Sequence, residues 1–220
     1  MEINPADLSL ENRYKLLIGM VVPRPIAFVS TISPEGRPNL APFSFFNGVS
    51  SAPLILAFAP ANKPDGTEKD TLRNAKPASE GGTGECVIHL VSESFATKMA
   101  ACAEPLAYGE SEFALSGLSM TPSRMVRPPR VAEALVAFEC RTRSVLRFAP
   151  GAPSGGNLVL AEVVHIHAAE GLVNERYHVD AERLAAIGRM GGPTYCRTRE
   201  RFDIPMGREA LRVADPLAGP

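Results

Sequence analysis

Residues 29–46 hold the residue types that could bind a flat ring carrying a phosphate. The stretch combines small hydroxylated residues, exposed backbone and aromatic side chains within two expected strands and their turn. Hydroxyls and backbone N–H groups can bind a phosphate without a large net charge, and aromatic or aliphatic side chains can cover a ring face. Lys69, Asp70 and Thr71 add a cation and a hydroxyl at an expected helix start, where anions are favoured. The same stretch could instead form a capped turn beside three core phenylalanines.

Other candidate motifs for chemistry are weaker. His165 and His167 alternate on one face of an expected strand, the geometry of a possible metal pair, yet no third ligand is evident near them. The glycine-rich segment 81–84 precedes a strand rather than a helix, which does not favour a phosphate loop. The sequence contains no nucleophile elbow, zinc-protease motif, P-loop or dinucleotide fingerprint after the first strand. We therefore expect no metal and assign no catalytic side chain.

The net charge and the composition exclude several classes of binding partner. The 220 residues include 23 Lys and Arg against 24 Asp and Glu, a net charge of −1 that lacks the electrostatic footprint of a nucleic-acid or anionic-membrane binder. No apolar run approaches the roughly 20 residues of a membrane helix, and the first residues show no basic and then apolar signal pattern. The four cysteines are not at zinc or thioredoxin spacing. We expect reduced thiols in a cytoplasmic protein, with no nucleic-acid or membrane partner.

Short extended segments joined by turns dominate the chain. The 18 glycines and 20 prolines suit many turns, and this pattern, with few helices between strands, favours a mainly β fold, a barrel or sandwich. Pro42 would suit an edge strand, a bulge or a loop. We expect one domain over residues 1–220, with its core at about 14–202 and a loosely held tail at 207–220. The expected strands are 26–32, 39–49, 54–59, 86–91, 136–146 and 158–168, and the expected helices are 10–17, 70–74, 94–102 and 181–187, the last capped by Asp180 and ended by Gly188.

Three segments resemble the flavin reductase-like, FMN-binding split-barrel family, nearest its flavoredoxin-like branch. They are Arg24 to Thr31, Asn39 to Asn47 and Lys69 to Asn74. Shorter segments agree in the same order, namely 83–85, 112–113, 117–119, 138–140, 162–164 and 189–192 followed by Tyr195. The resemblance covers about residues 14–202. It implies a six-stranded Greek-key split barrel, a homodimer, and noncovalent FMN near the dimer interface, with FAD as an alternative cofactor.

The resemblance also implies which residues contact the cofactor. Ser30 and Thr31 would lie near the flavin on the first strand, residues 69–71 would hold the phosphate end, and Arg189 and Tyr195 would close the site. The residues between them would contact the ring edge or ribityl chain, or pack beside the ring. The full set of matching positions is Ser30, Thr31, Asn39, Ala41, Ser44, Phe45, Phe46, Lys69, Asp70, Thr71, Arg189 and Tyr195.

One departure from the family pattern affects the predicted function. Many members carry Gly-Asp-His before the late strand, associated with the nicotinamide donor, whereas this chain has Ser154 to Asn157 there. We predict an FMN-binding oxidoreductase that uses NAD(P)H to reduce flavin or passes electrons onward, with a monooxygenase or redox protein as a partner. Two alternatives stay open: a non-enzymatic FMN electron carrier serving a protein partner, and a barrel that has lost its flavin.

Overall fold

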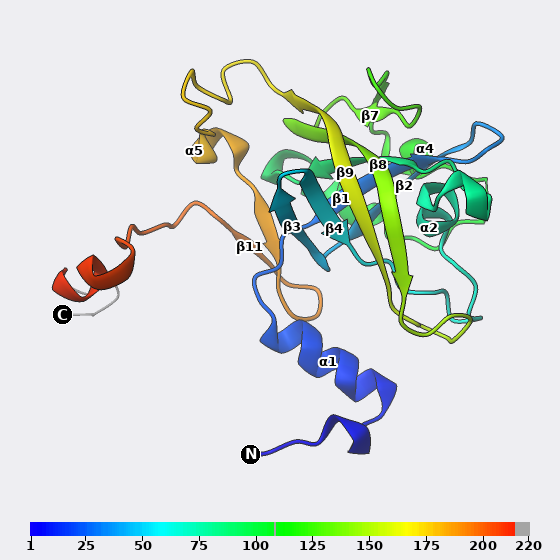
Figure 1. The fold of residues 1–220 in the computed structure, drawn as a ribbon, viewed down its shortest axis with the longest axis horizontal. Coiled ribbons are helices and arrows are strands. Elements are labelled where there is room, and N and C mark those ends of the chain that lie inside the picture. Colours follow the sequence, from blue (N-terminus) through cyan, green and yellow to red (C-terminus); the bar gives the residue numbers. More distant parts are fainter. Residues whose placement is uncertain (108, 214–220) are drawn as a thin grey trace.

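A curved antiparallel sheet forms the body of the protein (Figure 1). The structure is a computed structural model, and it describes residues 1–107 and 109–213. The strand order in the sheet is β2-β1-β5-β8-β9-β4-β3, so β2 and β3 are its edges. The strands are β1 (Ala27–Ile32), β2 (Pro38–Phe43), β3 (Phe46–Ser51), β4 (Leu54–Phe58), β5 (Glu85–Leu90), β8 (Val136–Arg147) and β9 (Asn157–Ala168).

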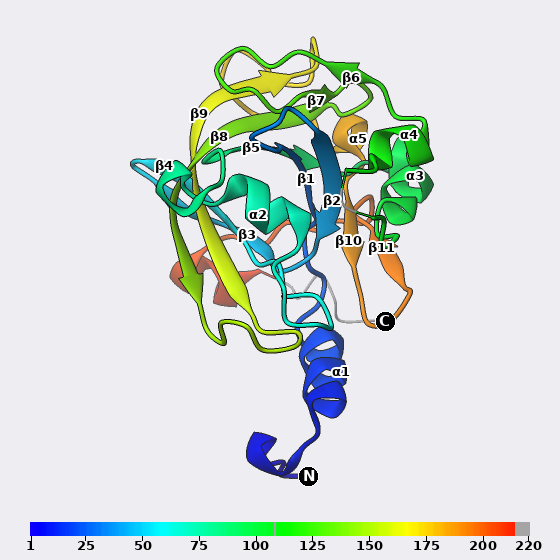
Figure 2. The same ribbon diagram turned by 90° about the vertical axis from the view of Figure 1, so that its right-hand side faces the viewer.

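Short elements surround this sheet. Figure 2 shows α2 inside the curve of the sheet, α3 and α4 beside the β10–β11 hairpin, and α1 projecting away from the body. No helix in the described residues is long and apolar enough to cross a membrane. The helices are α1 (Leu10–Met20), α2 (Asp70–Ala75), α3 (Ala96–Ala101), α4 (Glu112–Ser116) and α5 (Ala181–Leu184), and the short hairpins are β6 (Met120–Thr121) with β7 (Arg130–Val131) and β10 (Ile187–Arg189) with β11 (Tyr195–Arg197).

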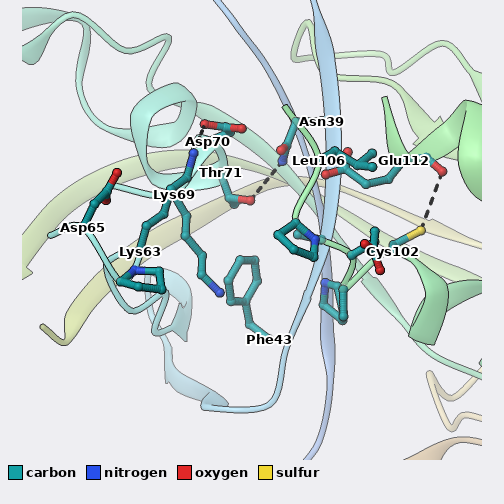
Figure 3. A pocket seen from close by; sticks show the side chains of 16 residues that line it. Asn39, Phe43, Lys63, Asp65, Lys69, Asp70, Thr71, Cys102, Leu106 and Glu112 are labelled. Atoms are coloured by element: carbon teal, nitrogen blue, oxygen red, sulfur yellow. Dashed lines mark hydrogen bonds and ion pairs between the residues drawn. The ribbon is translucent and has the colours of Figure 1, made fainter. Parts of the chain in front are cut away.

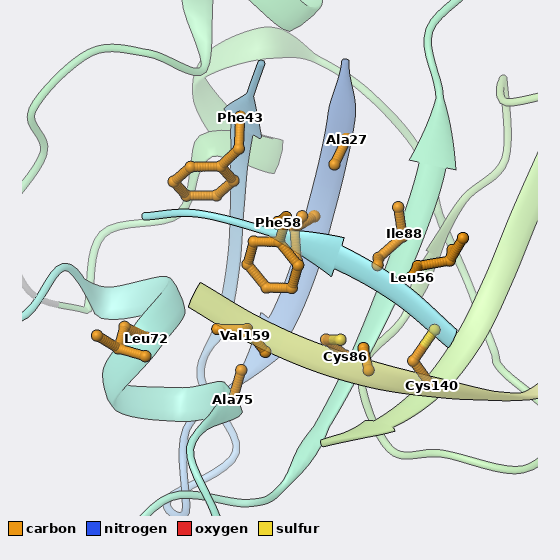
Figure 4. Packing of buried hydrophobic residues seen from close by; sticks show 12 residues of the cluster. Ala27, Phe43, Leu56, Phe58, Leu72, Ala75, Cys86, Ile88, Cys140 and Val159 are labelled. Atoms are coloured by element: carbon orange, nitrogen blue, oxygen red, sulfur yellow. The ribbon is translucent and has the colours of Figure 1, made fainter. Parts of the chain in front are cut away.

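Strand β1 is buried on both faces, which explains its nearly continuous apolar sequence. Successive side chains of a strand point to opposite faces. Val29 therefore packs with Phe58 in a cluster under α2, whereas Phe28 packs with Met99 in a second cluster toward α3 and α4. Figure 4 shows Phe58 in the first cluster together with Leu72 of α2. The side chains of Phe28, Val29 and Phe58 are fully buried. Burial of this kind supplies the main driving force for the fold.

The mainly β prediction is confirmed, and the main sheet has seven strands, one more than the six that the resemblance implies. The expected segment 39–49 divides into β2 and β3 at Ser44 and Phe45. Pro42 lies within β2, opposite Phe28 of β1. Strand β2 is an edge strand that pairs with β1 alone, and a proline, which lacks an N–H donor, is tolerated at such an edge. The expected edge position of this proline is therefore confirmed.

The predicted helix 181–187 was too long. Helix α5 ends at Leu184, because Ala185 adopts a left-handed conformation with φ of 44°. Gly188 does not end this helix but lies in β10, where a Cβ would stand 2.9 Å from Cys196 Sγ and 3.0 Å from Pro23 Cβ. The glycine thus serves close packing of the hairpin rather than a helix cap.

The other predicted helices and the tail differ in smaller ways. Helix α1 runs three residues beyond the expected 10–17, and the expected helix 94–102 begins as a 3-10 turn at Glu93–Phe95 before α3. Helix α4 and the two short hairpins were not predicted. In the expected tail, Gly207–Arg212 forms a 3-10 turn, and residues 214–220 lie outside the described residues.

The two histidines on β9, His165 and His167, contact each other, and His167 contacts a buried carboxylate. The Nε2 atom of His167 contacts the carboxylate of Glu139, which is fully buried. That carboxylate also accepts a 2.8 Å hydrogen bond from the backbone N–H of Arg124, so it anchors the segment before β7. The rings of His165 and His167 stack edge to face. Within the described part of the chain, no group of three metal-ligating side chains gathers here or elsewhere.

Candidate functional site

Two neighbouring hollows open beside β2 and share Pro42 and Ala103. The first, which we name the lysine hollow, has a volume of about 540 Å³ and contains Lys63 and Lys69. The second, the arginine hollow, has a volume of about 510 Å³ and contains Arg24 and Arg189. Both volumes lie within the roughly 300–1,000 Å³ range of small-molecule sites.

Lys69 provides the unpaired cation of the lysine hollow. It stands immediately before α2, and its Nζ atom lies 6.0 Å from the centre of the Phe43 ring (Figure 3). No carboxylate pairs with it among the described residues, whereas Lys63 Nζ contacts Asp70 Oδ1 at 3.1 Å. Burial of the Lys69 ammonium lowers its pKa, and the nearby charge of Lys63 lowers it further. An anion beside Lys69 would relieve both effects.

A buried polar network fixes the wall of the lysine hollow. Asn39 Nδ2 on β2 donates to Thr71 Oγ1 on α2 at 2.9 Å and to Thr31 Oγ1 on β1 at 3.2 Å. Asn74 Nδ2 donates to the same Thr31 hydroxyl at 3.1 Å. The network therefore ties α2 to both strands. Thr31 is almost fully enclosed and supports Asn39 rather than lining the hollow.

The opposite wall of the lysine hollow carries an acidic group. Glu112 on α4 is 7% exposed, and its Oε2 atom accepts a 2.9 Å hydrogen bond from the backbone N–H of Leu40. Burial raises the pKa of Glu112 above its usual value, and the charge of Asp70 adds to that rise, against the opposing effect of the Leu40 N–H. Burial also raises the pKa of Cys102, whose Sγ atom lies near the Glu112 carbonyl.

The segment 154–157 supports the loop that carries Lys63. Asn157 Nδ2 donates to Pro60 O at 3.0 Å and to Asn62 Oδ1 at 2.9 Å. Gly66, with φ of 84°, lies so close to Gly151 O that a Cβ there would be at 2.2 Å. In the segment that departs from the Gly-Asp-His pattern noted in the sequence, Asn157 thus supplies a loop-anchoring side chain.

Arg24 forms the back of the arginine hollow. Its Nη1 atom donates to the carbonyls of Ile18 and Val21 at 2.6 Å each, and its Nη2 atom donates to Met190 O at 2.9 Å. Its Nε atom donates to Ser44 Oγ at 3.3 Å. Burial lowers the pKa of this guanidinium. These bonds join the end of α1, the β2–β3 turn and the β10–β11 hairpin.

The predicted cofactor residues fall into three groups. The lysine hollow brings together Asn39, Ala41, Lys69, Asp70 and Thr71. The arginine hollow brings together Ser44, Arg189 and Tyr195. Neither hollow is lined by Ser30, Thr31, Phe45 or Phe46.

The residues of the third group have other surroundings. Ser30 is fully buried, and its hydroxyl has no hydrogen-bond partner among the residues that the structure describes. The ring of Phe45 lies 5.9 Å from the Cζ atom of Arg24, and Phe46 packs against the apolar cluster under α2.

Sequence reasoning missed Lys63, Cys102 and Glu112 as lining residues. The Glu112-Phe113 pair contributed to the family resemblance, which was the one signal that could have drawn attention to α4. Lys63 lies in a loop between two predicted elements, and nothing local distinguishes it from a solvated surface lysine.

Comparisons with known proteins agree with this architecture. The model of the flavin reductase-like domain matches residues 19–185. An uncharacterised protein of Halalkalibacterium halodurans is 37% identical over 93% of this chain and 95% of its own length. The structure of nitrilotriacetate monooxygenase component B from Bacillus cereus is 34% identical, with a TM-score of 0.85 over 93% of this chain and 98% of that one.

A flavoredoxin shares the fold at lower identity. The flavoredoxin of Desulfovibrio vulgaris (Miyazaki F) is 18% identical, with a TM-score of 0.66 over 92% of this chain and 96% of that one. Together with the domain match, this likeness confirms the flavin reductase-like, split-barrel resemblance seen in the sequence.

Replacing Glu112 with Gln tests the electrostatics of the acidic wall. Because the folded-state pKa of Glu112 is raised, ionisation of its carboxyl group lowers the free energy of unfolding. This loss is absent at a pH below the ordinary carboxyl pKa and complete at a pH above the raised pKa. We expect Glu112→Gln, which can still accept the Leu40 N–H bond, to exceed the wild type in unfolding free energy by on the order of 1 kcal/mol at pH 8. Urea unfolding from pH 4 to pH 8 measures the gap, which should close at the acidic end.

The exposed Glu175→Gln variant is the control and should track the wild type throughout. A gap that stays constant with pH, or widens toward acid, would contradict the assignment of a destabilised carboxylate at Glu112.

Proposed function

The chain belongs to the flavin reductase-like family, and we propose that it is an FMN-binding oxidoreductase of the flavin reductase type. The observation that carries this proposal is the unpaired Lys69 ammonium in a hollow of suitable size. An exposed ammonium at a hollow, with no carboxylate beside it among the described residues, can give a bound phosphate a charge-assisted hydrogen bond.

The donor set of the lysine hollow fits a single terminal phosphate. Lys69 supplies a full charge, Lys63 is partly neutralised by Asp70, and Thr71 and Asn39 supply a hydroxyl and an amide. We propose that these residues hold the phosphate end of FMN. One free cation among the described lining residues suits FMN better than the diphosphate of FAD. The ring would then extend along Ala41 and Pro42 toward Ser44.

When bound, FMN supplies the redox chemistry, accepting a hydride from NAD(P)H and passing electrons to flavin, oxygen or a redox partner. The protein's own residues bind and orient. Asn39 keeps β2 and α2 at a fixed separation, so the phosphate groups and the ring site stay in register. Glu112 keeps a proton to higher pH than an ordinary carboxyl group, which limits repulsion of a phosphate across the hollow.

The second candidate function is an FMN electron carrier without its own nicotinamide site. The observation that favours it is the anchoring role of Asn157 where family members carry Gly-Asp-His. The likeness to flavoredoxin concerns the fold alone. An enzyme and a carrier differ in whether reduced nicotinamide bleaches the bound flavin.

We also propose a homodimer. Leu10, Tyr14 and Leu17 are 53%, 56% and 47% exposed and lie along one face of α1, a helix with no buried residue in the described chain. An apolar helical stripe of this kind is typical of a surface that another element covers. A second copy is the partner that the family resemblance implies.

The spectrum of the purified protein is the first test of the function. We expect the protein, as purified or after FMN titration, to show flavin absorbance bands that NADH or NADPH bleaches in stopped-flow mixing. Protein that stays colourless through the titration would reject flavin binding. Flavin that binds but resists rapid bleaching by either nicotinamide would favour the carrier.

The Lys69→Ala substitution tests the phosphate assignment. Loss of one charge-assisted bond should weaken FMN by about 1.5–3 kcal/mol, or roughly 10- to 150-fold in Kd. Calorimetry on the FMN-free protein measures the change. The control is Lys15→Ala, which removes an exposed ammonium on α1 and should leave the Kd as in the wild type. Equal FMN affinities for Lys69→Ala and the wild type would reject the role.

A charge in the α1 stripe tests the dimer. Sedimentation velocity of the wild type should give twice the 23.5 kDa chain mass, and Leu17→Glu should shift the protein toward the monomer because it places a charge in an apolar contact. Asn12→Glu, on the opposite side of the same helix, should leave the dimer intact. A wild-type monomer, or equal effects of both variants, would contradict this interface.

A further inference from the structure

Two arginines face one another across a backbone bridge in the arginine hollow. Arg24 N–H donates to Arg189 O at 2.9 Å, and Arg189 N–H donates to Arg24 O at 2.8 Å. Residues directly opposite in an antiparallel bridge project their side chains to the same side, and like charges in that position are destabilising. The charge of Arg189 is accordingly one cause of the lowered pKa of Arg24.

Only neutral groups offset these two charges among the described residues of the hollow. Arg24 binds backbone carbonyls and the Ser44 hydroxyl, and two of the carbonyls belong to the negative end of α1, which offsets part of its charge. Arg189 contacts the hydroxyl of Tyr195 and the carbonyl of Gly192. By contrast, Arg147 elsewhere contacts two carboxylates.

The floor of the arginine hollow is apolar. Ile26 and Met99 are 4% and 1% exposed, and Pro42 and Ala103 continue the floor to the boundary with the lysine hollow. The lining residues within the described chain include no Asp or Glu. A flat apolar body can therefore lie on this floor while an acidic group reaches the free donors of Arg189.

We propose that the arginine hollow binds a small organic anion with a flat ring, its acidic group on Arg189 and its ring over Ile26 and Met99. This inference rests on the proposed function, because the ring of a flavin anchored at Lys69 would end near the shared Pro42. The anion is then a second substrate of that activity, held beside the cofactor. An aromatic carboxylate, with its charge at one end of a flat apolar ring, has the required chemistry.

Calorimetry with 2-naphthoate and its neutral counterpart 2-naphthamide tests the site in FMN-free and FMN-loaded protein. We expect naphthoate to bind at least about tenfold more tightly than naphthamide, the scale of one charge-assisted bond. Arg189→Gln should remove that preference, and Arg189→Lys should retain most of it. The exposed Arg176→Gln variant is the matched control and should behave as the wild type.

Two substitutions distinguish ligand binding in the arginine hollow from ligand binding in the lysine hollow. Arg189→Gln should weaken naphthoate more than FMN, and Lys69→Ala should weaken FMN more than naphthoate. Equal binding of naphthoate and naphthamide, or equal losses in Arg189→Gln and Arg176→Gln, would overturn the proposal. It would also fall if Arg189→Gln weakened FMN as much as naphthoate, because Arg189 would then belong to the flavin site. Loss of binding in Arg189→Lys as complete as in Arg189→Gln would likewise refute recognition by charge.

Failure of the proposed function gives a different result. A wild-type protein that binds no FMN rejects the flavin assignment, while naphthoate titration of the same FMN-free protein still tests the arginine hollow. Competition then distinguishes an aromatic acid from the nicotinamide that the proposed function already uses. Displacement of naphthoate by benzoate but by neither NADH nor NADPH supports an aromatic acid, and displacement by either nicotinamide overturns the proposal.

Discussion

The buried guanidinium of Arg24 ties together the segments that form the arginine hollow. Its planar head offers five donors in a fixed arrangement, and four hydrogen bonds lead to three separate segments of the chain. The bond to Met190 joins residues 166 positions apart in sequence. Burying this charge is costly in principle, but carbonyl oxygens at the end of α1 compensate it. Without it, α1, the β2–β3 turn and the β10–β11 hairpin would have no common anchor.

A second constraint is the polar end of β1. The strand is apolar through Val29 and then places two buried hydroxyls, Ser30 and Thr31, at the edge of the core. Thr31 accepts hydrogen bonds from both Asn39 and Asn74, so the hydroxyl sets the spacing between β2 and α2. Thr31 is tolerated in the core because it is satisfied in this network, whereas the Ser30 hydroxyl has no hydrogen-bond partner among the described residues. The strand thus changes from core packing to positioning the site within a few residues.

Sequence reasoning succeeded where the signal is local. Apolar runs and Gly/Pro turns predicted the main strands, and the Lys69–Thr71 stretch was correctly placed at the start of a helix. It failed where tertiary contacts decide. The sequence placed Gly188 at the end of a helix, yet the residue lies in β10, where Cys196 and Pro23 leave no room for a side chain. The pairing of Arg24 with Arg189 has no sequence signal, because a bridge between distant residues leaves no periodicity.

The net charge of −1 carries little information about either hollow, because salt screens exposed charges beyond about 8–10 Å. Each hollow is governed by the groups that line it. In the lysine hollow, the cation of Lys69 faces a wall that includes Glu112, so an anionic end and a hydrogen-bond-donating end can both be accommodated. In the arginine hollow, two guanidiniums share a face without a carboxylate among the described lining residues. A ligand with a negative charge at one end therefore suits the lysine hollow in one orientation. The arginine hollow selects for negative charge alone. Ligands in the two hollows would meet at Pro42, which lines both.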